Sequence, residues 1–273
     1  MHLMVGRAPP PPEWLRSDAR RLYGLDPVAY EAGRPDYPER VYDVLKQRCG
    51  LTAGTSVLEI GPGPGRVTRR LLATGARVLA VEPDPASAAH LSQTMESNAL
   101  EVVEGSFEDA PLPDHFDLAV AAMSFHWVDQ ELGLPKLGRV VRPGGWVAVW
   151  WTVFGDRTRP DPFHEATRHL LPEGAGPDRE PAQPQFELDA EQRRFDLARR
   201  AGLADVDGEL IRWTVHMDPA QVRALYASMI AILRRPQPEQ HRLLDTLVAL
   251  AGDEFGGVVE RPFVTALYTG RRP

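Results

Sequence analysis

The chain has 273 residues, of which 43% are hydrophobic and 25% are charged, so it can bury a substantial core. Its formal net charge of -7 gives no electrostatic reason to expect a nucleic-acid partner, and no apolar run of about 18 residues predicts a membrane span. The single cysteine, Cys49, excludes an internal disulfide. Together with the lack of an apolar signal-peptide segment, it predicts a cytoplasmic protein.

The N-terminal part of the chain is rich in proline. Residues 1–12 end in four prolines and predict a disordered tail. Residues 13–50 carry two helical patterns separated by a proline-containing turn, and we expect them to form an N-terminal helical cap. Because prolines end any helix there, the turn holds Tyr30, Arg34 and Tyr37.

Short apolar runs then alternate with helical patterns. Strands are expected at Val57–Ile60, Val78–Val81, Leu100–Glu104, Phe116–Met123 and Trp146–Val153. Helices are expected at Glu39–Arg48, Val67–Thr74, Pro85–Ser97 and Leu132–Val141. This alternation predicts a doubly wound, mostly parallel α/β sheet, in which ligands bind beyond the carboxyl ends of the strands.

A glycine-rich turn joins the first strand to the following helix. Gly61, Gly63 and Gly65 stand at every second position, and glycines let backbone amides approach a ligand with no Cβ in the way. The segment therefore predicts a nucleotide-type binding site.

The details of this turn distinguish between nucleotide ligands. Arg66 replaces the third glycine of the dinucleotide fingerprint G-x-G-x-x-G, and Pro62 and Pro64 remove amide donors that a pyrophosphate would use. Glu59 instead places a carboxylate beside the ligand, which suits a cation. Glu82 ends the second strand, where its carboxylate can accept both hydroxyls of a ribose.

The series Glu59-x-Gly61-x-Gly63-x-Gly65, followed by Glu82, resembles the S-adenosylmethionine site of class I methyltransferases. The resemblance implies S-adenosylmethionine as cofactor, S-adenosylhomocysteine as product and no metal ion. It also implies a seven-stranded Rossmann-like sheet with an antiparallel last strand, and it makes residues 51–155 the cofactor-binding core.

The same resemblance assigns roles around the turn. An acid after the third strand accepts the adenine amino group, here Asp109 with Glu108 as the alternative, while Phe107 lies near the ring. Tyr30 and Arg34 fold over the cofactor, with aromatic packing and a surface arginine as the competing interpretation. The predicted cofactor contacts are completed by Pro83 and Ala122.

The fourth strand runs into Ser124-Phe125-His126-Trp127, where methyltransferases present residues to the methyl group. The segment lacks the Asn/Asp-Pro-Pro-aromatic signature of enzymes that methylate nucleobase amines. Its His-Trp pair resembles small-molecule methyltransferases of the trans-aconitate and ubiquinone-biosynthesis type. His126 is the candidate general base, and a histidine that only hydrogen-bonds the loop is the alternative.

The C-terminal part is less regular. Residues 156–205 are rich in Pro, Gly, Arg and Glu and predict an insertion or lid. Residues 206–273 are expected to complete the sheet with strands at Glu209–His216 and Phe263–Tyr268, and to cover the substrate with a helix at Ala220–Leu233. The candidate substrate contacts, for which core packing is the alternative, are Tyr37, Trp127, Trp213, Tyr226 and Met229.

The sequence as a whole indicates methyl transfer from S-adenosylmethionine to a small-molecule acceptor. It leaves O-, N-, C- and carboxyl-methylation open, and it does not predict an oligomeric state. The competing hypotheses are a protein of the same fold that binds the cofactor without transferring methyl groups, and a nicotinamide-dependent oxidoreductase.

Overall fold

The computed structural model describes residues 31–171 and 186–273 of the chain. The predicted tail, the first predicted helix, Tyr30 and the middle of the predicted lid lie outside the described residues.

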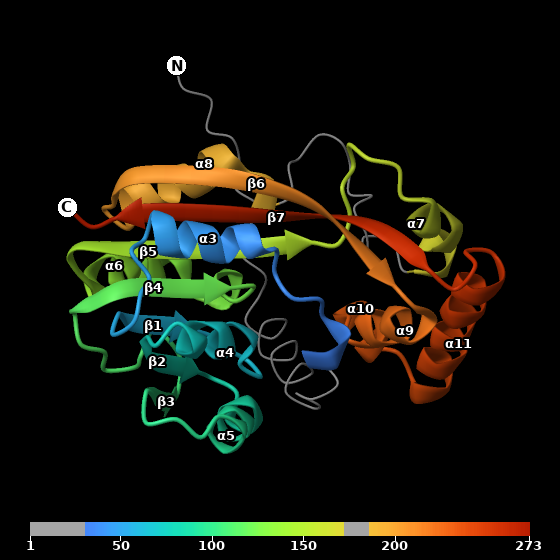
Figure 1. The fold of residues 1–273 in the computed structure, drawn as a ribbon, viewed down its shortest axis with the longest axis horizontal. Coiled ribbons are helices and arrows are strands. Elements are labelled where there is room, and N and C mark those ends of the chain that lie inside the picture. The colour runs from blue at the N-terminus through green and yellow to red at the C-terminus, as the bar shows by residue number, and fades with distance from the viewer. Residues whose placement is uncertain (1–30, 172–185) are drawn as a thin grey trace.

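The fold is built on one seven-stranded sheet in the order β3-β2-β1-β4-β5-β7-β6 (Figure 1). Its strands are β1 (Ser56–Ile60), β2 (Arg77–Glu82), β3 (Leu100–Glu104), β4 (Phe116–Ala122), β5 (Val141–Val153), β6 (Ala204–Met217) and β7 (Val259–Arg271). The strands β1 to β5 pair in parallel, whereas β7 runs antiparallel to both β5 and β6. The predicted doubly wound sheet with an antiparallel last strand is therefore confirmed.

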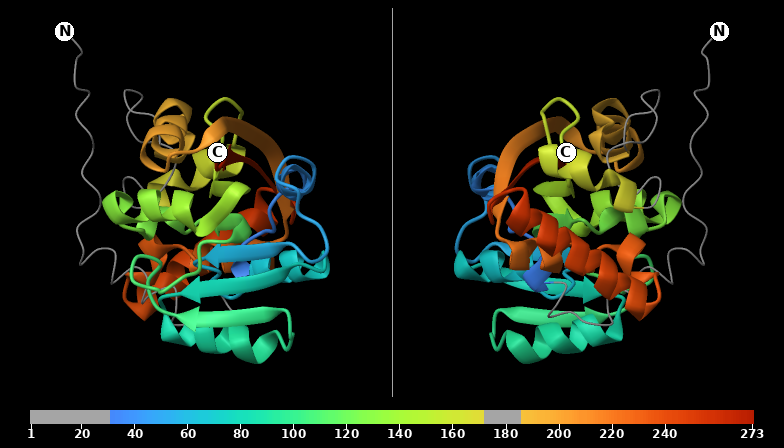
Figure 2. Two further views of the ribbon diagram at one scale, coloured as in Figure 1. Left: turned by 90° about the vertical axis from the view of Figure 1, so that its left-hand side faces the viewer. Right: turned by 90° about the vertical axis from the view of Figure 1, so that its right-hand side faces the viewer.

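Alternate residues of the central strands feed two cores on opposite faces of the sheet. On β1, Val57 belongs to the core covered by helices α3 (Glu39–Gln47), α4 (Arg66–Ala73) and α5 (Pro85–Thr94). Its neighbour Leu58 belongs to the core covered by α6 (Gln130–Val140) and by the helical turns α8 (Ala190–Phe195) and η4 (Asp196–Arg200). Figure 2 shows α3 and α6 on opposite sides of the sheet. Strands buried on both faces explain the continuous apolar runs in the sequence.

The predicted element boundaries hold closely in the parallel part of the sheet, with one instructive difference. Strand β5 begins at Val141, five positions before the expected Trp146. The Pro-Gly-Gly segment between them is incorporated as an irregularity, where the register with β4 shifts and Gly144 adopts a φ of 77°. A local turn pattern is thus absorbed into the strand.

Strands β6 and β7 extend past the rest of the sheet and carry a second, helical body (Figure 1). We call this body the helical unit; it comprises α7 (Pro162–Thr167), α9 (Pro219–Ala227), α10 (Ile230–Leu233) and α11 (Gln237–Asp253). Its own core gathers Phe163 of α7, Leu225 and Tyr226 of α9, Leu247 of α11 and Phe263 of β7. The long ribbon therefore connects two separate hydrophobic cores.

The single helix expected at Ala220–Leu233 is two helices, so that expectation was wrong. Helix α9 ends at Ala227, and Met229 is extended with φ -87° and ψ 134° before α10 starts. Two hydrogen bonds stabilise the break: the guanidinium of Arg34 donates to the Ser228 carbonyl at 3.1 Å, and the Ser228 hydroxyl donates to the Leu225 carbonyl at 2.6 Å. The backbone at Gly33 also lies so close to α9 that a Cβ there would sit 2.2 Å from the Ala224 carbonyl oxygen.

Among the described residues, no helix combines the length and the apolar character that a membrane crossing requires.

Candidate cofactor and acceptor site

A cavity of about 850 Å³ lies at the carboxyl ends of β1, β2 and β4 and reaches the helical unit. The strand order reverses between β1 and β4, which is the switch point where ligands bind in doubly wound sheets. The sequence-predicted site residues that line the cavity are Arg34, Tyr37, Glu59, Gly61, Gly63, Glu82, Pro83, Phe107, Glu108, Ala122, His126, Trp127, Tyr226 and Met229.

Three predicted residues do not line the cavity. Gly65 begins α4 in the left-handed conformation, and a Cβ there would lie 2.2 Å from Met95, so this glycine serves close packing. Asp109 is exposed and accepts a hydrogen bond from the Ser106 hydroxyl at 2.7 Å. Trp213 donates its indole N–H to Thr265 and packs on the ring of Phe263. Of the two candidate adenine acids, the structure brings Glu108 to the cavity.

The glycine turn has the backbone shape that its composition predicts. Gly61 and Gly63 have φ values of 65° and 56°, which residues with a Cβ rarely adopt. A Cβ on Gly61 would lie 2.6 Å from the Cβ of Ser124, whereas a Cβ on Gly63 would meet nothing within 4 Å. Gly61 is therefore required by packing, and Gly63 leaves the cavity open above the turn.

Glu59 is a buried carboxylate at the base of the cavity, with 1% of its surface exposed. Thr68 of α4 donates its hydroxyl to Glu59 Oε2 at 2.7 Å, which fixes the side chain. Burial, with a further contribution from the nearby charge of Glu82, raises the pKa of Glu59 to about 7. A positively charged ligand would favour the ionised form, so this carboxylate is suited to a cation.

Glu82 lies at the end of β2 and is also buried, with 6% exposed. Its two carboxylate oxygens accept the backbone N–H groups of Gly63 and Asp84, each at 2.9 Å. These bonds fix the carboxylate against the glycine turn. An ionised carboxylate has about four acceptor positions in all, which suits it to hydroxyl groups of a ligand.

The segment after β3 forms an apolar wall with a polar end. Phe107 is buried and lines the cavity. Glu108 accepts the Asp129 backbone N–H at 2.6 Å, and Lys136 donates to the carbonyl oxygens of Glu108 and Ala110. These bonds connect the wall to α6 and to its N-cap residue.

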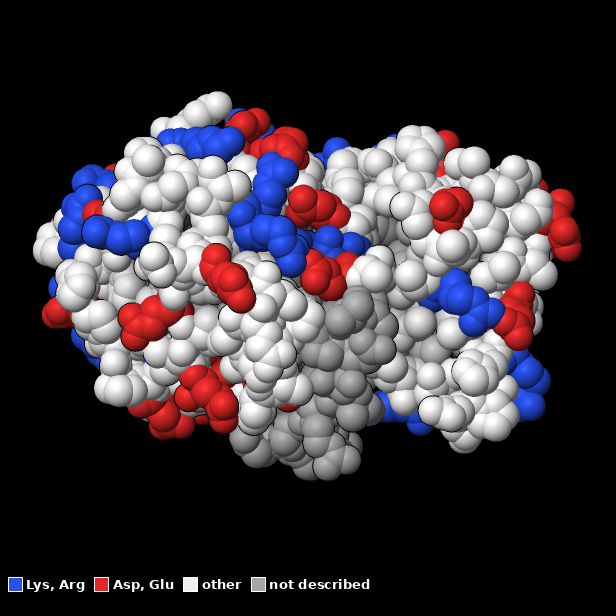
Figure 3. Space-filling view, turned by 60° about the horizontal axis from the view of Figure 1, so that its bottom comes forward, with Lys and Arg blue, Asp and Glu red and all other residues white. Residues whose placement is uncertain are grey.

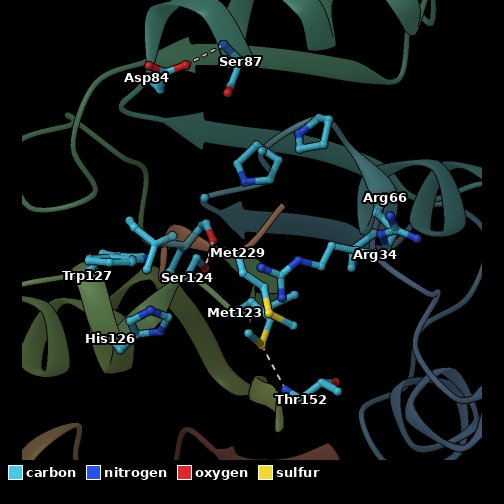
Figure 4. A pocket seen from close by; sticks show the side chains of 18 of the residues that line it. Arg34, Arg66, Asp84, Ser87, Met123, Ser124, His126, Trp127, Thr152 and Met229 are labelled. Atoms are coloured by element: carbon cyan, nitrogen blue, oxygen red, sulfur yellow. Dashed lines mark hydrogen bonds between the residues drawn. The ribbon is translucent and has the colours of Figure 1, made fainter. Parts of the chain in front are cut away.

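His126 lies on the short helical turn η1 (Phe125–Trp127), beside Trp127 at the cavity (Figure 4). The indole N–H of the buried Trp151 donates to His126 Nδ1 at 2.9 Å. Since an indole nitrogen only donates, Nδ1 must be the accepting nitrogen, and the proton of a neutral ring lies on Nε2. In this tautomer the remaining ring nitrogen is a hydrogen-bond donor.

The predicted substrate contacts divide into buried and accessible side chains. The ring of Tyr37 packs edge-on against Trp150, with ring centroids 5.6 Å apart. Tyr226 is 1% exposed, and its hydroxyl accepts from the Arg261 guanidinium at 2.8 Å. Met229 occupies the break between α9 and α10 and extends into the cavity (Figure 4).

Sequence reasoning missed several cavity residues. Met123 has a φ of 54°, a strained conformation for a non-glycine residue that no local pattern announces, and its sulfur accepts the Thr152 N–H at 2.9 Å. Ser124 donates to the Ile60 carbonyl at 2.5 Å and closes over Gly61. Arg234 and Arg235 also line the cavity; their signal was the pair of arginines directly after the predicted covering helix.

A sheet switch point carrying a glycine turn flanked by buried acids defines a nucleoside-binding α/β protein. Residues 58–149 match the family described as Methyltransferase domain. An uncharacterised methyltransferase of Mycobacterium tuberculosis is 31% identical over 179 residues, which cover 57% of this chain and 71% of that protein. The chain belongs to the class I S-adenosylmethionine-dependent methyltransferases, and S-adenosylmethionine is its cofactor. The predicted enzyme class is therefore confirmed.

Two further comparisons concern parts of the chain or the fold alone. A Haloarcula marismortui protein named as a ribosomal RNA small subunit methyltransferase A is 52% identical over 62 residues, 21% of this chain and 22% of its own. A solved structure of a Haemonchus contortus phosphoethanolamine N-methyltransferase superposes with a TM-score of 0.56 at 16% identity, covering 92% of this chain and 57% of that one.

The residues present fit the cofactor. The groups beside the glycine turn are the buried carboxylates Glu59 and Glu82, which suit a sulfonium and ribose hydroxyls. Pro62 and Pro64 leave the turn without the donors that a pyrophosphate requires.

Proposed function

We propose that the protein transfers the methyl group of S-adenosylmethionine to a small-molecule acceptor, which enters the cavity between the glycine turn and the helical unit. The observation that carries this proposal is the single cavity shared by the two regions. Its volume of about 850 Å³ is near the upper end of the roughly 300–1,000 Å³ of small-molecule pockets, which leaves room for an acceptor beside the cofactor.

The charge distribution supports a small acceptor over a nucleic acid. Lys/Arg and Asp/Glu side chains are interspersed on the face shown in Figure 3, without a single-sign patch of the kind that tracks phosphates. The match to the ribosomal RNA methyltransferase, at 62 residues, is too short to include both the glycine turn and helices α9–α11.

Five groups that line the cavity would hold the cofactor. Glu82 would accept the ribose hydroxyls, and Glu59 would face the cationic end of the molecule. Phe107 would contact the adenine ring and Glu108 its amino group, while Arg34 would cover the cofactor from the turn before α3. When bound, the cofactor supplies a methyl group that is already activated by the sulfonium.

The protein then positions the acceptor and excludes water, and it takes part in no covalent step. Trp127, Met123 and Met229 surround the cavity with apolar surface (Figure 4), which excludes water from the reacting groups. His126, with its proton on Nε2, would donate a hydrogen bond to the acceptor. We propose this role in place of the general base that the sequence indicated, because Trp151 donates a hydrogen bond to Nδ1.

The predicted lid contributes to the same enclosure. The described parts of residues 156–205 supply His164, Leu171 and Glu187 to the cavity wall. This supports the assignment of the segment as a cover over the acceptor, and of residues 206–273 as the part that completes both the sheet and that cover.

The proposal is tested with S-adenosylmethionine carrying a deuterated methyl group and a protein-free small-molecule extract of cells. We expect S-adenosylhomocysteine and a deuterium-labelled small molecule in equal amounts, measured by mass spectrometry. Binding of S-adenosylhomocysteine without any label transfer, while labelled RNA is formed from total cellular RNA, would contradict the proposed acceptor class.

A further inference from the structure

The cavity has opposite charges at its two ends. In the loop half, at the ends of β1 to β3, four carboxylates line the cavity and outnumber the one arginine of that half, Arg66; they are Glu59, Glu82, Asp84 and Glu108. Arg34 lies between the halves, where it is bonded to the Ser228 carbonyl. In the helical half, on and beside the helical unit, the lining cations are Arg234, Arg235 and Arg261. An acceptor that spans the helical half therefore meets a positive environment.

Arg261 of β7 has a structural role. It is 2% exposed, donates to Asp161 at 2.7 Å and to the Tyr226 hydroxyl at 2.8 Å, and lies 5.9 Å from the rings of both Phe163 and Phe263. Its charge is already compensated inside the helical unit. Arg261 is therefore not a candidate for binding an anionic ligand.

Arg234 and Arg235 follow α10 and differ from Arg261 in their partners. Within the described residues neither guanidinium forms an ion pair, and the one side-chain contact of Arg235 is to the Leu170 carbonyl at 3.3 Å. By contrast, Arg223 of α9 pairs with Asp245 of α11, and Arg212 of β6 pairs with Asp156.

This lack of a carboxylate has no explanation in composition, because the chain carries 38 acidic against 31 basic residues. Capping of α10 does not explain it either. The helix has four residues, so few peptide dipoles are aligned for a cation at its end to stabilise. Outside the loop half, Glu187 of η3 (Phe186–Leu188) is a lining carboxylate, and its charge interacts with that of Arg193.

We infer that the acceptor carries a carboxylate or phosphate group, and that Arg234 and Arg235 bind it at the helical end of the cavity. The inference rests on the proposed methyl transfer to a small molecule. Guanidinium groups bind both kinds of anion through paired N–H donors, and Met229 and Ile230 provide apolar surface beside them. Because carboxylates outnumber arginines in the loop half, the helical end is the favoured place for the anion.

The test uses the protein saturated with S-adenosylhomocysteine and titrated calorimetrically with inorganic phosphate in one arm and succinate in the other. We expect saturable binding in at least one arm, and the arm that binds identifies the anion class. The double variant Arg234→Gln/Arg235→Gln should weaken that binding at least about tenfold, because two charge-assisted contacts are lost.

The matched control is Arg199→Gln/Arg242→Gln, which removes the same charge from two exposed arginines outside the cavity. It should keep the anion affinity within about twofold, since exposed charges at a distance are screened by salt. No saturable anion binding, or equal binding by the two double variants, would overturn the inference.

A second measurement separates this inference from the proposed function. The cell extract is divided on an anion-exchange resin, and label transfer from deuterated S-adenosylmethionine is followed in both fractions. Labelled products in the retained fraction support an anionic acceptor. Labelled products in the unretained fraction alone would leave the methyltransferase function intact and refute the anion site. Failure to bind S-adenosylhomocysteine would refute the proposed function itself.

Discussion

The loop half and the helical half of the cavity are built in different ways. In the loop half, Glu59 and the glycines lie within seven consecutive residues, and Glu82 is fixed to that turn by a backbone hydrogen bond. In the helical half, the lining residues come from α7, α9, α10 and β7, far apart in the sequence. The difference teaches that cofactor binding is encoded locally here, whereas acceptor binding depends on how distant segments pack.

The largest expected effect tests whether the helical half can be destabilised independently of the loop half. Asp161→Asn keeps the cap of α7, because the amide oxygen can still accept the His164 N–H, but it leaves the buried charge of Arg261 uncompensated. We expect the free energy of unfolding to fall by about 3–5 kcal/mol, measured by urea denaturation. The substitution should accelerate hydrogen exchange more in α9 and α11 than in β1 and β4.

The control for this change is Asp245→Asn, which removes the exposed partner of Arg223 on the same unit. That substitution should lower the free energy of unfolding by less than about 1 kcal/mol, because exposed ion pairs contribute little to stability. If both substitutions lower the free energy of unfolding equally, or if hydrogen exchange accelerates equally in both cores, the Asp161–Arg261 pair does not stabilise the helical unit separately from the sheet.

The next effect tests the loop half. Glu82→Ala removes the carboxylate expected to accept the ribose hydroxyls, so S-adenosylhomocysteine should bind at least about tenfold more weakly by calorimetry. Glu104→Ala at the exposed end of the neighbouring strand β3 is the matched control, and its affinity should stay within about twofold. Equal affinities of the two variants would place the cofactor elsewhere.

A smaller effect is expected from pH. Burial raises the pKa of Glu59 to about 7 in the free protein, so the carboxyl is largely neutral at pH 6 and largely ionised at pH 8. A cationic ligand favours the ionised form. The affinity for S-adenosylmethionine, which carries the sulfonium, should therefore fall about tenfold as the pH is lowered from 8 to 6.

Two histidines, His126 and His164, line the same cavity, so the assignment to Glu59 needs a control. The control is Glu59→Gln, because the affinity of this variant for the cofactor should not vary with pH between 6 and 8. A pH dependence that persists in this variant would contradict the role of Glu59.

The smallest effect concerns the group between the two halves. If His126 donates a single neutral hydrogen bond to the acceptor, His126→Ala should lower kcat/KM for the labelled acceptor by about three- to tenfold. A general base would cost about a hundredfold or more. Affinity for S-adenosylhomocysteine should not change. A hundredfold loss in kcat/KM would instead support His126 as a general base.

The sequence predicted the parallel sheet and the loop half because each of their signals lies in one short segment. A buried strand, three alternating glycines and an acid at the next strand end are all local, and their geometry follows from backbone rules. The choice between Glu108 and Asp109 was beyond this reasoning, since a one-residue shift decides which side chain faces the cavity.

The helical half was beyond the sequence for a different reason. The break between α9 and α10 is stabilised by Arg34, which bonds to a carbonyl 194 positions away, and the tautomer of His126 depends on Trp151 in strand β5. Helical periodicity runs through Ser228 without a local signal. Only the packed chain shows that Arg234 and Arg235 reach the cavity while Trp213 does not.

The β6–β7 ribbon has a consequence for how this enzyme can change. Helices α9 to α11 leave the ribbon at Met217 and return to it at Val259, so the whole excursion is inserted between two paired residues. Exchanging that excursion for the corresponding part of another methyltransferase would alter the acceptor while both ends remain anchored in the same hydrogen-bonded ladder. The ribbon is thus a natural junction for chimeras with new substrate selectivity.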